Sequence, residues 1–294
     1  MRSIKEIFND AVKKYMDYPK EVNIETTGRC NAKCVFCPHD SIERKNTQME
    51  DALFFKIISD LKEIPKELLY NISPFKVNEP LMDKTFFDKM EIINRELPNA
   101  YIRFFSNFNM ATDEHIKRLF RIENLSQIWI SLNSMDNLEY KQLMGLNLDK
   151  TLENIDKLLR YKKNNGINKK IVISRVNDNT SNDNTFVDKL KARFKENMDQ
   201  IQISLIPRGE WIDHNSFNKV TTYEKRECLR WFEISICCTG EVSFCCMDGK
   251  CEYSIGNVNN QSILEIYNNP KFKDLRKESI NRSLVEPCKF CTYD

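Results

Sequence analysis

Three cysteines near the N-terminus are spaced so that they can hold a metal cluster. Cys30, Cys34 and Cys37 lie within eight residues, separated by three and then by two residues. Three thiolates at this spacing can bind three corners of a cubic four-iron four-sulfur cluster and leave one iron open to a substrate. A structural zinc ion instead takes four protein ligands, usually from paired Cys-x2-Cys segments. The spacing therefore favours a cluster with one open iron.

Two other interpretations of these cysteines stay open. A zinc site would need a distant fourth ligand, for which His39 is the candidate, and the thiols could also be unrelated buried side chains. Their position favours chemistry, because they directly follow the first predicted strand, in the loop where barrel enzymes place their active sites.

A second set of cysteines lies in the C-terminal third of the chain. Cys228, Cys245, Cys288 and Cys291 offer four thiolates, from a predicted hairpin and a closing Cys-x2-Cys pair. Four thiolates can fully coordinate a second four-iron cluster, which would store or pass electrons. The alternative is a four-cysteine zinc ribbon. Cys246 directly follows Cys245, so either residue can be the second ligand.

The first cysteine set resembles the signature of the radical S-adenosyl-L-methionine (SAM) superfamily, and the resemblance covers nearly the whole chain. It implies that a reduced 4Fe-4S cluster cleaves SAM to methionine and a 5′-deoxyadenosyl radical, which removes a hydrogen atom from the substrate. Phe36 matches the aromatic residue before the third cysteine and would pack near adenine. Asn78 and Glu79 fall where the family carries Gly-Gly-Glu-Pro, which implies that Glu79 binds the ammonium group of SAM.

The same resemblance places further cofactor contacts at strand ends. Ser106-Asn107-Phe108 matches a Thr-Asn-Gly segment of the family, and Ser131-Leu132-Asn133 matches a Ser-x-Asp segment. Asn107, Ser131 and Asn133 are therefore expected to line the ribose and carboxylate of SAM. Arg175, on the fifth predicted strand, could pair with a carboxylate, or it could form a surface ion pair.

The C-terminal cysteines resemble the SPASM and Twitch extensions of this superfamily. Cys228 is followed after eleven residues by Gly240 and after four more by Cys245, as at the opening of these extensions. Cys288-x2-Cys291 matches their close. A full SPASM domain needs more cysteines after this pair, so we expect one auxiliary 4Fe-4S cluster, as in Twitch. The remaining thiols are interpreted as small buried residues, although a second auxiliary cluster stays open. They are Cys237, Cys238, Cys251 and one of Cys245 or Cys246.

The cysteine sets are carried by alternating strand and helix patterns. Six β-rich runs lie at residues 22–26, 69–77, 101–106, 127–133, 170–176 and 201–207, and helical patterns at 86–97, 115–121, 138–161 and 186–194 separate them. A further helix after the first cysteines is expected to begin with a capping box at Thr47-x-x-Glu50. Six such units predict an α/β fold, a partial (β/α)6 TIM-like barrel.

The pattern changes after about residue 210, which indicates a small C-terminal α+β iron-sulfur domain. Short β-rich runs flank Thr239-Gly240 and predict a hairpin. We therefore divide the chain into an N-terminal helix (1–20), a radical SAM partial barrel (21–211) and a SPASM/Twitch auxiliary cluster domain (212–294).

Composition excludes several classes of partner. The chain of 294 residues has 45 basic and 43 acidic residues, and this net charge of +2 argues against nucleic acid or a membrane surface as partner. No apolar run approaches the roughly 18 residues of a membrane span, so a cytoplasmic protein is expected. Thiols stay reduced in the cytosol, which makes cluster ligation a better explanation of eleven cysteines than disulfides. The resemblance implies a flavodoxin- or ferredoxin-type electron donor.

Three functions are compatible with these features. The leading hypothesis is an oxidoreductase that dehydrogenates a secondary alcohol of a sugar or aminocyclitol, because the pattern resembles the 2-deoxy-scyllo-inosamine dehydrogenase type. The rival is a maturase that crosslinks, epimerises or oxidises a ribosomally made precursor peptide. The third is a non-catalytic iron-sulfur or zinc protein.

Candidate substrate contacts follow the sixth predicted strand, at the mouth of the barrel. They are Arg208, Glu210, Trp211 and His214. His214 could act as a base because imidazole titrates near neutrality. An interdomain linker with ordinary surface polarity accounts for these residues equally well.

Overall fold

The computed structural model describes residues 3–207, 211–212, 227–277 and 281–291. Within them, nine strands form one sheet in the order β6-β5-β4-β3-β2-β1-β7-β8-β9. Strands β1 to β6 run parallel to one another and β7 runs parallel to β1, whereas β8 is antiparallel to both of its neighbours, β7 and β9. The strands are β1 (Glu21–Ile24), β2 (Tyr70–Ser73), β3 (Ala100–Ser106), β4 (Leu125–Ser131), β5 (Lys170–Val176), β6 (Ile201–Ile206), β7 (Glu233–Ile236), β8 (Glu241–Ser243) and β9 (Ser254–Asn257).

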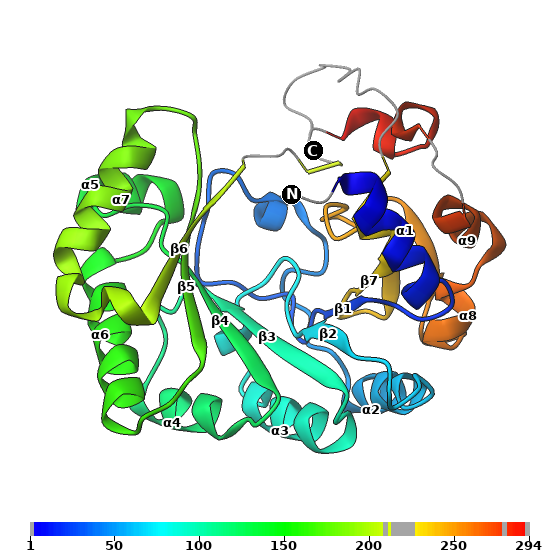
Figure 1. Cartoon of the computed structure of the whole chain (residues 1–294), viewed down its shortest axis with the longest axis horizontal. Helices are drawn as coiled ribbons and strands as arrows, with labels where there is room; N and C mark the ends of the chain where they lie inside the picture. The colour runs from blue at the N-terminus through cyan, green and yellow to red at the C-terminus, as the bar shows by residue number, and fades with distance from the viewer. Residues whose placement is uncertain (1–2, 208–210, 213–226, 278–280, 292–294) are drawn as a thin grey trace.

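Helices cover the outer side of the sheet. Figure 1 shows β1 to β6 as an open arc, with α2, α3, α4 and α6 along its outside. This arrangement confirms the predicted partial TIM-like barrel. The α-helices are α1 (Ile4–Tyr15), α2 (Asp51–Leu61), α3 (Phe86–Glu96), α4 (Asp113–Arg121), α5 (Asn137–Met144), α6 (Leu148–Asn164), α7 (Ser181–Arg193), α8 (Ile263–Tyr267) and α9 (Pro270–Lys277).

Side chains alternate between the two faces of each strand, and this alternation positions the site. In β3, Ile102 and Phe104 are buried, and Phe104 lies 5.6 Å from Phe86 of α3, measured between ring centroids. Arg103 and Phe105 alternate with them and point to the inner side of the arc. The hydrophobic core therefore lies between the sheet and the outer helices, and polar and aromatic side chains line the inner side of the sheet.

The capping box predicted at Thr47-x-x-Glu50 is wrong. Helix α2 begins directly after Glu50, and no side chain caps it. The Thr47 carbonyl instead accepts a hydrogen bond from Gly28 N–H at 2.8 Å, and Thr27 forms an isolated antiparallel bridge with Gln48. These backbone contacts close the cysteine loop at its base, so the helix can start only after them.

The single helix predicted over residues 138–161 is two helices, α5 and α6. Gly145 ends α5 in the left-handed region, with φ 70°, and its N–H donates to the Lys141 carbonyl. The side chain of Asn147 then caps α6 by accepting from Lys150 N–H. Glycine adopts this conformation at low cost, so it ends the helix although the apolar pattern continues.

The C-terminal region continues the barrel sheet. Strand β7 pairs with β1, and β7 and β8 form the predicted hairpin around Thr239-Gly240. The predicted N-terminal helix is α1, whose Phe8 ring packs edge-on against Trp231 and Phe232. The boundary between residues 211 and 212 thus divides two parts of one sheet, and it stays a prediction.

Candidate functional site

The first cysteine set lies in the loop that follows the carboxyl end of β1. Cys37 N–H donates to the Cys34 carbonyl at 3.0 Å, which curls the loop around the third cysteine. Lys33 N–H donates to the Met144 carbonyl at 2.8 Å and so attaches the loop to the end of α5. The loop is therefore held by a bond within itself and by a bond to the end of α5.

The three thiols share one buried environment. Burial raises the pKa of Cys30 to about 12 and that of Cys37 to about 11, and it raises the pKa of Cys34 as well. The charges of Cys37 and Cys30 also raise the pKa of Cys34, so the three thiols are electrostatic neighbours. Thiolates in such a place need cationic partners, and the irons of a cluster fit this requirement.

His39, the alternative zinc ligand, already forms one hydrogen bond with the backbone near the cysteine loop. Its Nε2 makes a hydrogen bond with the Gly28 carbonyl at 2.8 Å. In the described part of the chain, no three His, Cys, Asp or Glu side chains converge at the spacing of a single metal ion. A zinc ion holds its sulfur ligands at about 2.3 Å. A cubane distributes its ligands over separate irons, so it accommodates the wider spacing of these thiols.

Glu79 and Asn78 lie beside the cysteine loop. The Glu79 carboxylate is buried and accepts hydrogen bonds from Ser106 Oγ and from Asn107 N–H, both at 2.7 Å. Burial raises the pKa of Glu79 to about 7, against the effect of these bonds. Asn78 Nδ2 is buried and has no hydrogen-bond partner among the described residues. A buried carboxylate and an unused amide donor fit the ammonium and carboxylate groups of SAM.

The end of β3 brings Asn107 to the cysteine loop. Asn107 Nδ2 donates to the side-chain oxygen of Asn31, which lies next to Cys30 in the sequence, at 2.7 Å. Phe108 has φ 59°, in the left-handed region that favours glycine. This is the position at which the family sequence Thr-Asn-Gly carries its glycine, so the turn keeps its backbone shape with a different residue.

The side chains predicted on β4 and β5 make strong contacts within the chain. Ser131 ends β4, and Asn133 Oδ1 accepts a hydrogen bond from Val176 N–H at 2.8 Å. The Arg175 guanidinium is buried and pairs with three carboxylates rather than lying on the surface. These carboxylates are Asp183, Asp178 and Glu139, at 2.9, 3.0 and 3.4 Å. Contacts of Ser131, Asn133 and Arg175 with SAM stay predictions.

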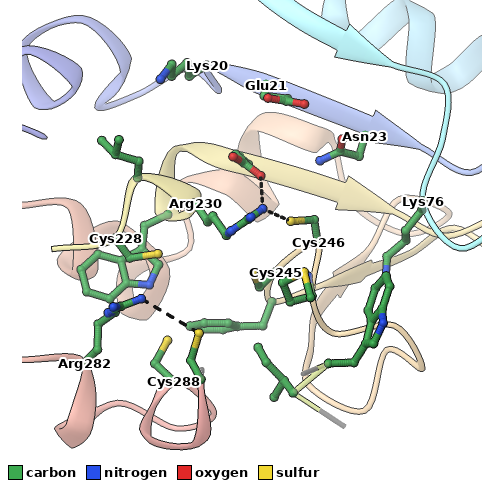
Figure 2. Close-up of a pocket in the computed structure, with 18 of the residues that line it drawn as sticks. Lys20, Glu21, Asn23, Lys76, Cys228, Arg230, Cys245, Cys246, Arg282 and Cys288 are labelled. Atoms are coloured by element: carbon green, nitrogen blue, oxygen red, sulfur yellow. Dashed lines mark hydrogen bonds and ion pairs between the residues drawn. The ribbon is translucent and has the colours of Figure 1, made fainter. Parts of the chain in front are cut away.

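The second cysteine set lines one cavity of about 620 Å³. Figure 2 shows Cys245 and Cys246 on one side of it and Cys228 and Cys288 on the other. Burial, together with the charges of Cys228 and Cys291, raises the pKa of Cys288 to about 12. A shared space lined by cysteines from the hairpin and from the C-terminal pair fits a four-iron cluster.

Cys245 and Cys246 differ in their surroundings. A hydrogen bond from the Cys245 thiol lowers the pKa of Cys246, and the Arg230 guanidinium lowers it further. Arg230 Nη1 donates to the Cys246 sulfur at 2.6 Å. Cys245 is an electrostatic neighbour of Cys228. This neighbourhood favours Cys245 as the cluster ligand, in agreement with its spacing from Gly240 in the sequence.

The three remaining cysteines are buried, and they do not line the cavity of the second cysteine set. The thiols of Cys237 and Cys251 make a hydrogen bond to each other, which lowers the pKa of Cys237. Cys238 N–H donates to a carboxylate oxygen of Glu25 at 3.2 Å. These contacts fit the interpretation of the three residues as small buried side chains.

Three of the candidate substrate contacts, Arg208, Glu210 and His214, lie outside the described residues. Trp211 is described, and its indole N–H donates to the Phe36 carbonyl at 3.0 Å. This bond connects the segment after β6 to the first cysteine loop. Trp211 also lines the cavity of the second cysteine set.

Sequence reasoning missed an aromatic wall inside the arc. Phe75 stacks on Phe105 with 5.4 Å between ring centroids, and Phe105 stacks on Trp129 at 5.6 Å. All three line the same cavity as the C-terminal cysteines, together with Arg103 and Glu21, which form an ion pair. The alternation of residues in β3 was the available signal, because Arg103 and Phe105 fall on the face opposite to the core.

Family models match two parts of the chain. The model of the radical SAM superfamily matches residues 24–192, more than half of the sequence. The SPASM model, an iron-sulfur cluster-binding domain, matches residues 228–292. The two matches contain the first and the second cysteine set, respectively.

A curated relative shares part of the sequence. It is the tungsten-containing aldehyde ferredoxin oxidoreductase cofactor-modifying protein of Pyrococcus furiosus, which is 26% identical over 151 residues. The match covers 51% of this chain and 41% of the relative. The chain thus spans less than half the length of that protein.

Solved structures show the same fold at low sequence identity. BtrN in complex with AdoMet and 2-DOIA is 16% identical with a TM-score of 0.58, and 93% of each chain is covered. Streptococcus suis SuiB bound to precursor peptide SuiA is 16% identical with a TM-score of 0.65, covering 97% of this chain and 73% of SuiB. Native anSMEcpe with bound AdoMet is 17% identical with a TM-score of 0.65, covering 92% and 87%.

The two domains imply the cofactors. A radical SAM domain implies a 4Fe-4S cluster and SAM, and a SPASM domain implies auxiliary iron-sulfur clusters. Among the described residues, no helix combines the length and apolar character needed to cross a membrane. The family matches, the fold and the two cysteine sets agree, and the chain therefore belongs to the radical SAM superfamily as an enzyme with a SPASM iron-sulfur domain.

Proposed function

We propose that this chain is an oxidoreductase that dehydrogenates a secondary alcohol of a sugar or aminocyclitol, with one auxiliary cluster as electron acceptor. One observation carries the proposal: a single cavity of about 620 Å³ is lined both by the C-terminal cysteines and by the inner face of the barrel strands. A volume of this size suits a small molecule. A substrate held there would lie next to both the barrel and the auxiliary site.

The lining of the cavity suits a carbohydrate-like ring. The stacked rings of Phe75, Phe105 and Trp129 offer a flat surface against which the C–H face of a saturated ring can pack. Figure 2 shows Glu21, Asn23 and Lys20 along one edge of the cavity. Their side chains offer acceptors and donors for hydroxyl and amino groups.

The residues of the chain have separate tasks in this proposal. Cys30, Cys34 and Cys37 would hold the first cluster, Phe36, Asn78 and Glu79 would orient SAM, and the C-terminal cysteines would hold the auxiliary cluster. When bound, the first cluster with SAM supplies a radical that takes a hydrogen atom, and the auxiliary cluster supplies an acceptor for one electron. The alcohol carbon would lose one hydrogen atom and one electron and its hydroxyl one proton, which leaves a ketone.

The protein contributes orientation and exclusion of water. The aromatic wall and the partly buried Glu21–Arg103 pair would fix the ring so that one C–H bond faces the cysteine loop. The Trp211–Phe36 bond connects the lining of the cavity to that loop. We also propose that the barrel domain ends at residue 211 and the auxiliary cluster domain begins at residue 212. A flavodoxin- or ferredoxin-type protein would be the electron donor.

The second candidate is a maturase that acts on a ribosomally made precursor peptide. It is favoured by the similarity to SuiB, which was solved bound to precursor peptide SuiA. An aromatic wall can also hold a peptide side chain. The two candidates differ in the substrate that stimulates SAM cleavage.

The test uses anaerobically reconstituted protein with SAM and a chemical reductant. Aminocyclitols and sugars are compared with precursor peptides from the gene neighbourhood, and 5′-deoxyadenosine and product masses are measured. Stimulated 5′-deoxyadenosine formation with loss of two hydrogens from a cyclitol or sugar supports the proposal. Stimulation by a peptide alone establishes the maturase. Absence of 5′-deoxyadenosine with an intact first cluster would leave a non-catalytic iron-sulfur protein.

A further inference from the structure

Hydrogen-bond donors and positive charge gather around the second cysteine set. Arg230 and Arg282 both line its cavity, and both have their guanidinium groups directed at sulfur, as Figure 2 shows. The cysteines themselves come from three separate segments, so this arrangement is produced only by the fold.

Arg230 lies beside the hairpin cysteines. Its Nη1 donates to the Cys246 sulfur at 2.6 Å, and it also interacts electrostatically with Cys245 and Cys228. Glu233 lies 3.9 Å from the same guanidinium and positions it. Arg230 is therefore next to the cluster whichever of the two adjacent cysteines is the ligand.

Arg282 lies beside the C-terminal pair. It is buried, with 4% of its surface exposed, and its Nη1 is 4.0 Å from the Cys291 sulfur. Its charge also lowers the pKa values of Cys228 and Cys288 against the effect of burial. The two arginines thus approach the cysteine set from different segments of the chain.

Trp231 provides a third donor. Its side chain is buried, and the indole N–H has no hydrogen-bond partner among the described residues. Trp231 lines the same cavity as Cys288, and its unpartnered N–H opposes the increase in the pKa of Cys288 that burial causes. Phe8 of α1 packs edge-on against the indole ring and holds it in place.

We propose that Arg230, Arg282 and Trp231 are positioning residues that raise the reduction potential of the auxiliary cluster and make it a better electron acceptor. The inference rests on the proposed function, since it requires that the second cysteine set holds a cluster. Reduction adds a negative charge to a cluster that four thiolates already make anionic. Neighbouring guanidinium groups and N–H···S contacts stabilise the reduced form, and burial keeps solvent from screening them.

The test measures the midpoint potential of the auxiliary cluster by redox titration followed by electron paramagnetic resonance. The protein is the reconstituted holoenzyme, and Cys34→Ala removes the signal of the first cluster. We expect Arg230→Gln, Arg282→Gln and Trp231→Phe each to shift the midpoint to a lower potential. Arg282→Lys keeps the charge and is expected to retain most of the wild-type value.

Arg276→Gln is the matched control. Arg276 is a buried arginine of the same C-terminal region, and its guanidinium stacks on Tyr267 at 3.7 Å instead of facing a thiol. Its replacement is expected to lower stability and leave the midpoint unchanged. Unchanged midpoints in the Gln and Phe variants, with their iron content intact, overturn the inference alone. A wild-type protein that binds only about four irons overturns the proposed function and the inference together.

Discussion

Arg44 and Glu25 form a buried ion pair that connects the first cysteine loop to the C-terminal region. Arg44 donates from Nε and Nη2 to the two carboxylate oxygens at 2.5 and 3.1 Å. Glu25 also accepts from the N–H groups of Val77 and Cys238, and Arg44 donates to the Gly249 carbonyl at 2.7 Å. One pair thus holds the end of β1, the cysteine loop, the loop after β2 and the hairpin of β7 and β8 in register.

Arg44→Met is expected to destabilise the protein strongly. It leaves the Glu25 carboxylate buried without its cation, which costs about 3–5 kcal/mol. The measurement is urea unfolding of the apoprotein under anaerobic conditions. Arg95→Met is the control, because Arg95 pairs with Glu96 at the surface, where such pairs contribute about 0–1 kcal/mol. Equal effects of the two substitutions would contradict the role of the buried pair.

Cys34→Ala is expected to abolish formation of 5′-deoxyadenosine and to reduce the iron content from about eight to about four per chain. The substitution removes one of three thiolates that hold the first cluster. Iron analysis and product chromatography measure the two effects. Cys238→Ala, which removes a buried thiol outside both cysteine sets, is the control and keeps both values. Retained 5′-deoxyadenosine formation in Cys34→Ala would refute the ligand assignment.

Cys245→Ala and Cys246→Ala are expected to differ. Cys245 is an electrostatic neighbour of Cys228, whereas the Cys246 sulfur accepts a hydrogen bond from Arg230, so only the first substitution should remove a cluster ligand. The Cys245 variant then loses about four irons and the Cys246 variant keeps about eight. Iron content and the electron paramagnetic resonance signal of the auxiliary cluster distinguish them. The reverse pattern would assign the ligand to Cys246.

Glu79→Gln is expected to weaken SAM binding by roughly ten- to 150-fold, because a charge-assisted hydrogen bond contributes about 1.5–3 kcal/mol. The affinity is measured by equilibrium binding of SAM to the reconstituted protein. Ser106→Ala is the control. It removes one donor to Glu79 but keeps the carboxylate, so its effect should be smaller. A stable Glu79→Gln variant with wild-type affinity would show that Glu79 only supports the loops around it.

Local features of the sequence were sufficient for the cysteine sets and for the main elements. Several of the cysteines lie close together in the chain, and the six strands alternate with helical patterns that have a different period. Both patterns can therefore be recognised in the sequence without a structure. The strand predicted over residues 170–176 coincides with β5, and the predicted hairpin is formed by β7 and β8.

Local patterns failed where contacts from elsewhere decide the conformation. Thr47 has the spacing of a helix cap, but the segment around it pairs with Gly28 and Thr27 and closes the cysteine loop instead. The apolar pattern continues through Gly145, yet the left-handed conformation of that residue ends α5.

The types and spacing of the cysteines defined the chemistry, because the first set lies within eight residues and the second keeps a recognisable spacing although it comes from three segments. Only the tertiary structure placed Arg282 and Trp231 beside Cys291 and Cys288, and Arg44 against Glu25. Charges and donors that act on a buried site come from distant segments, and their effect depends on distance and burial, which no local pattern records.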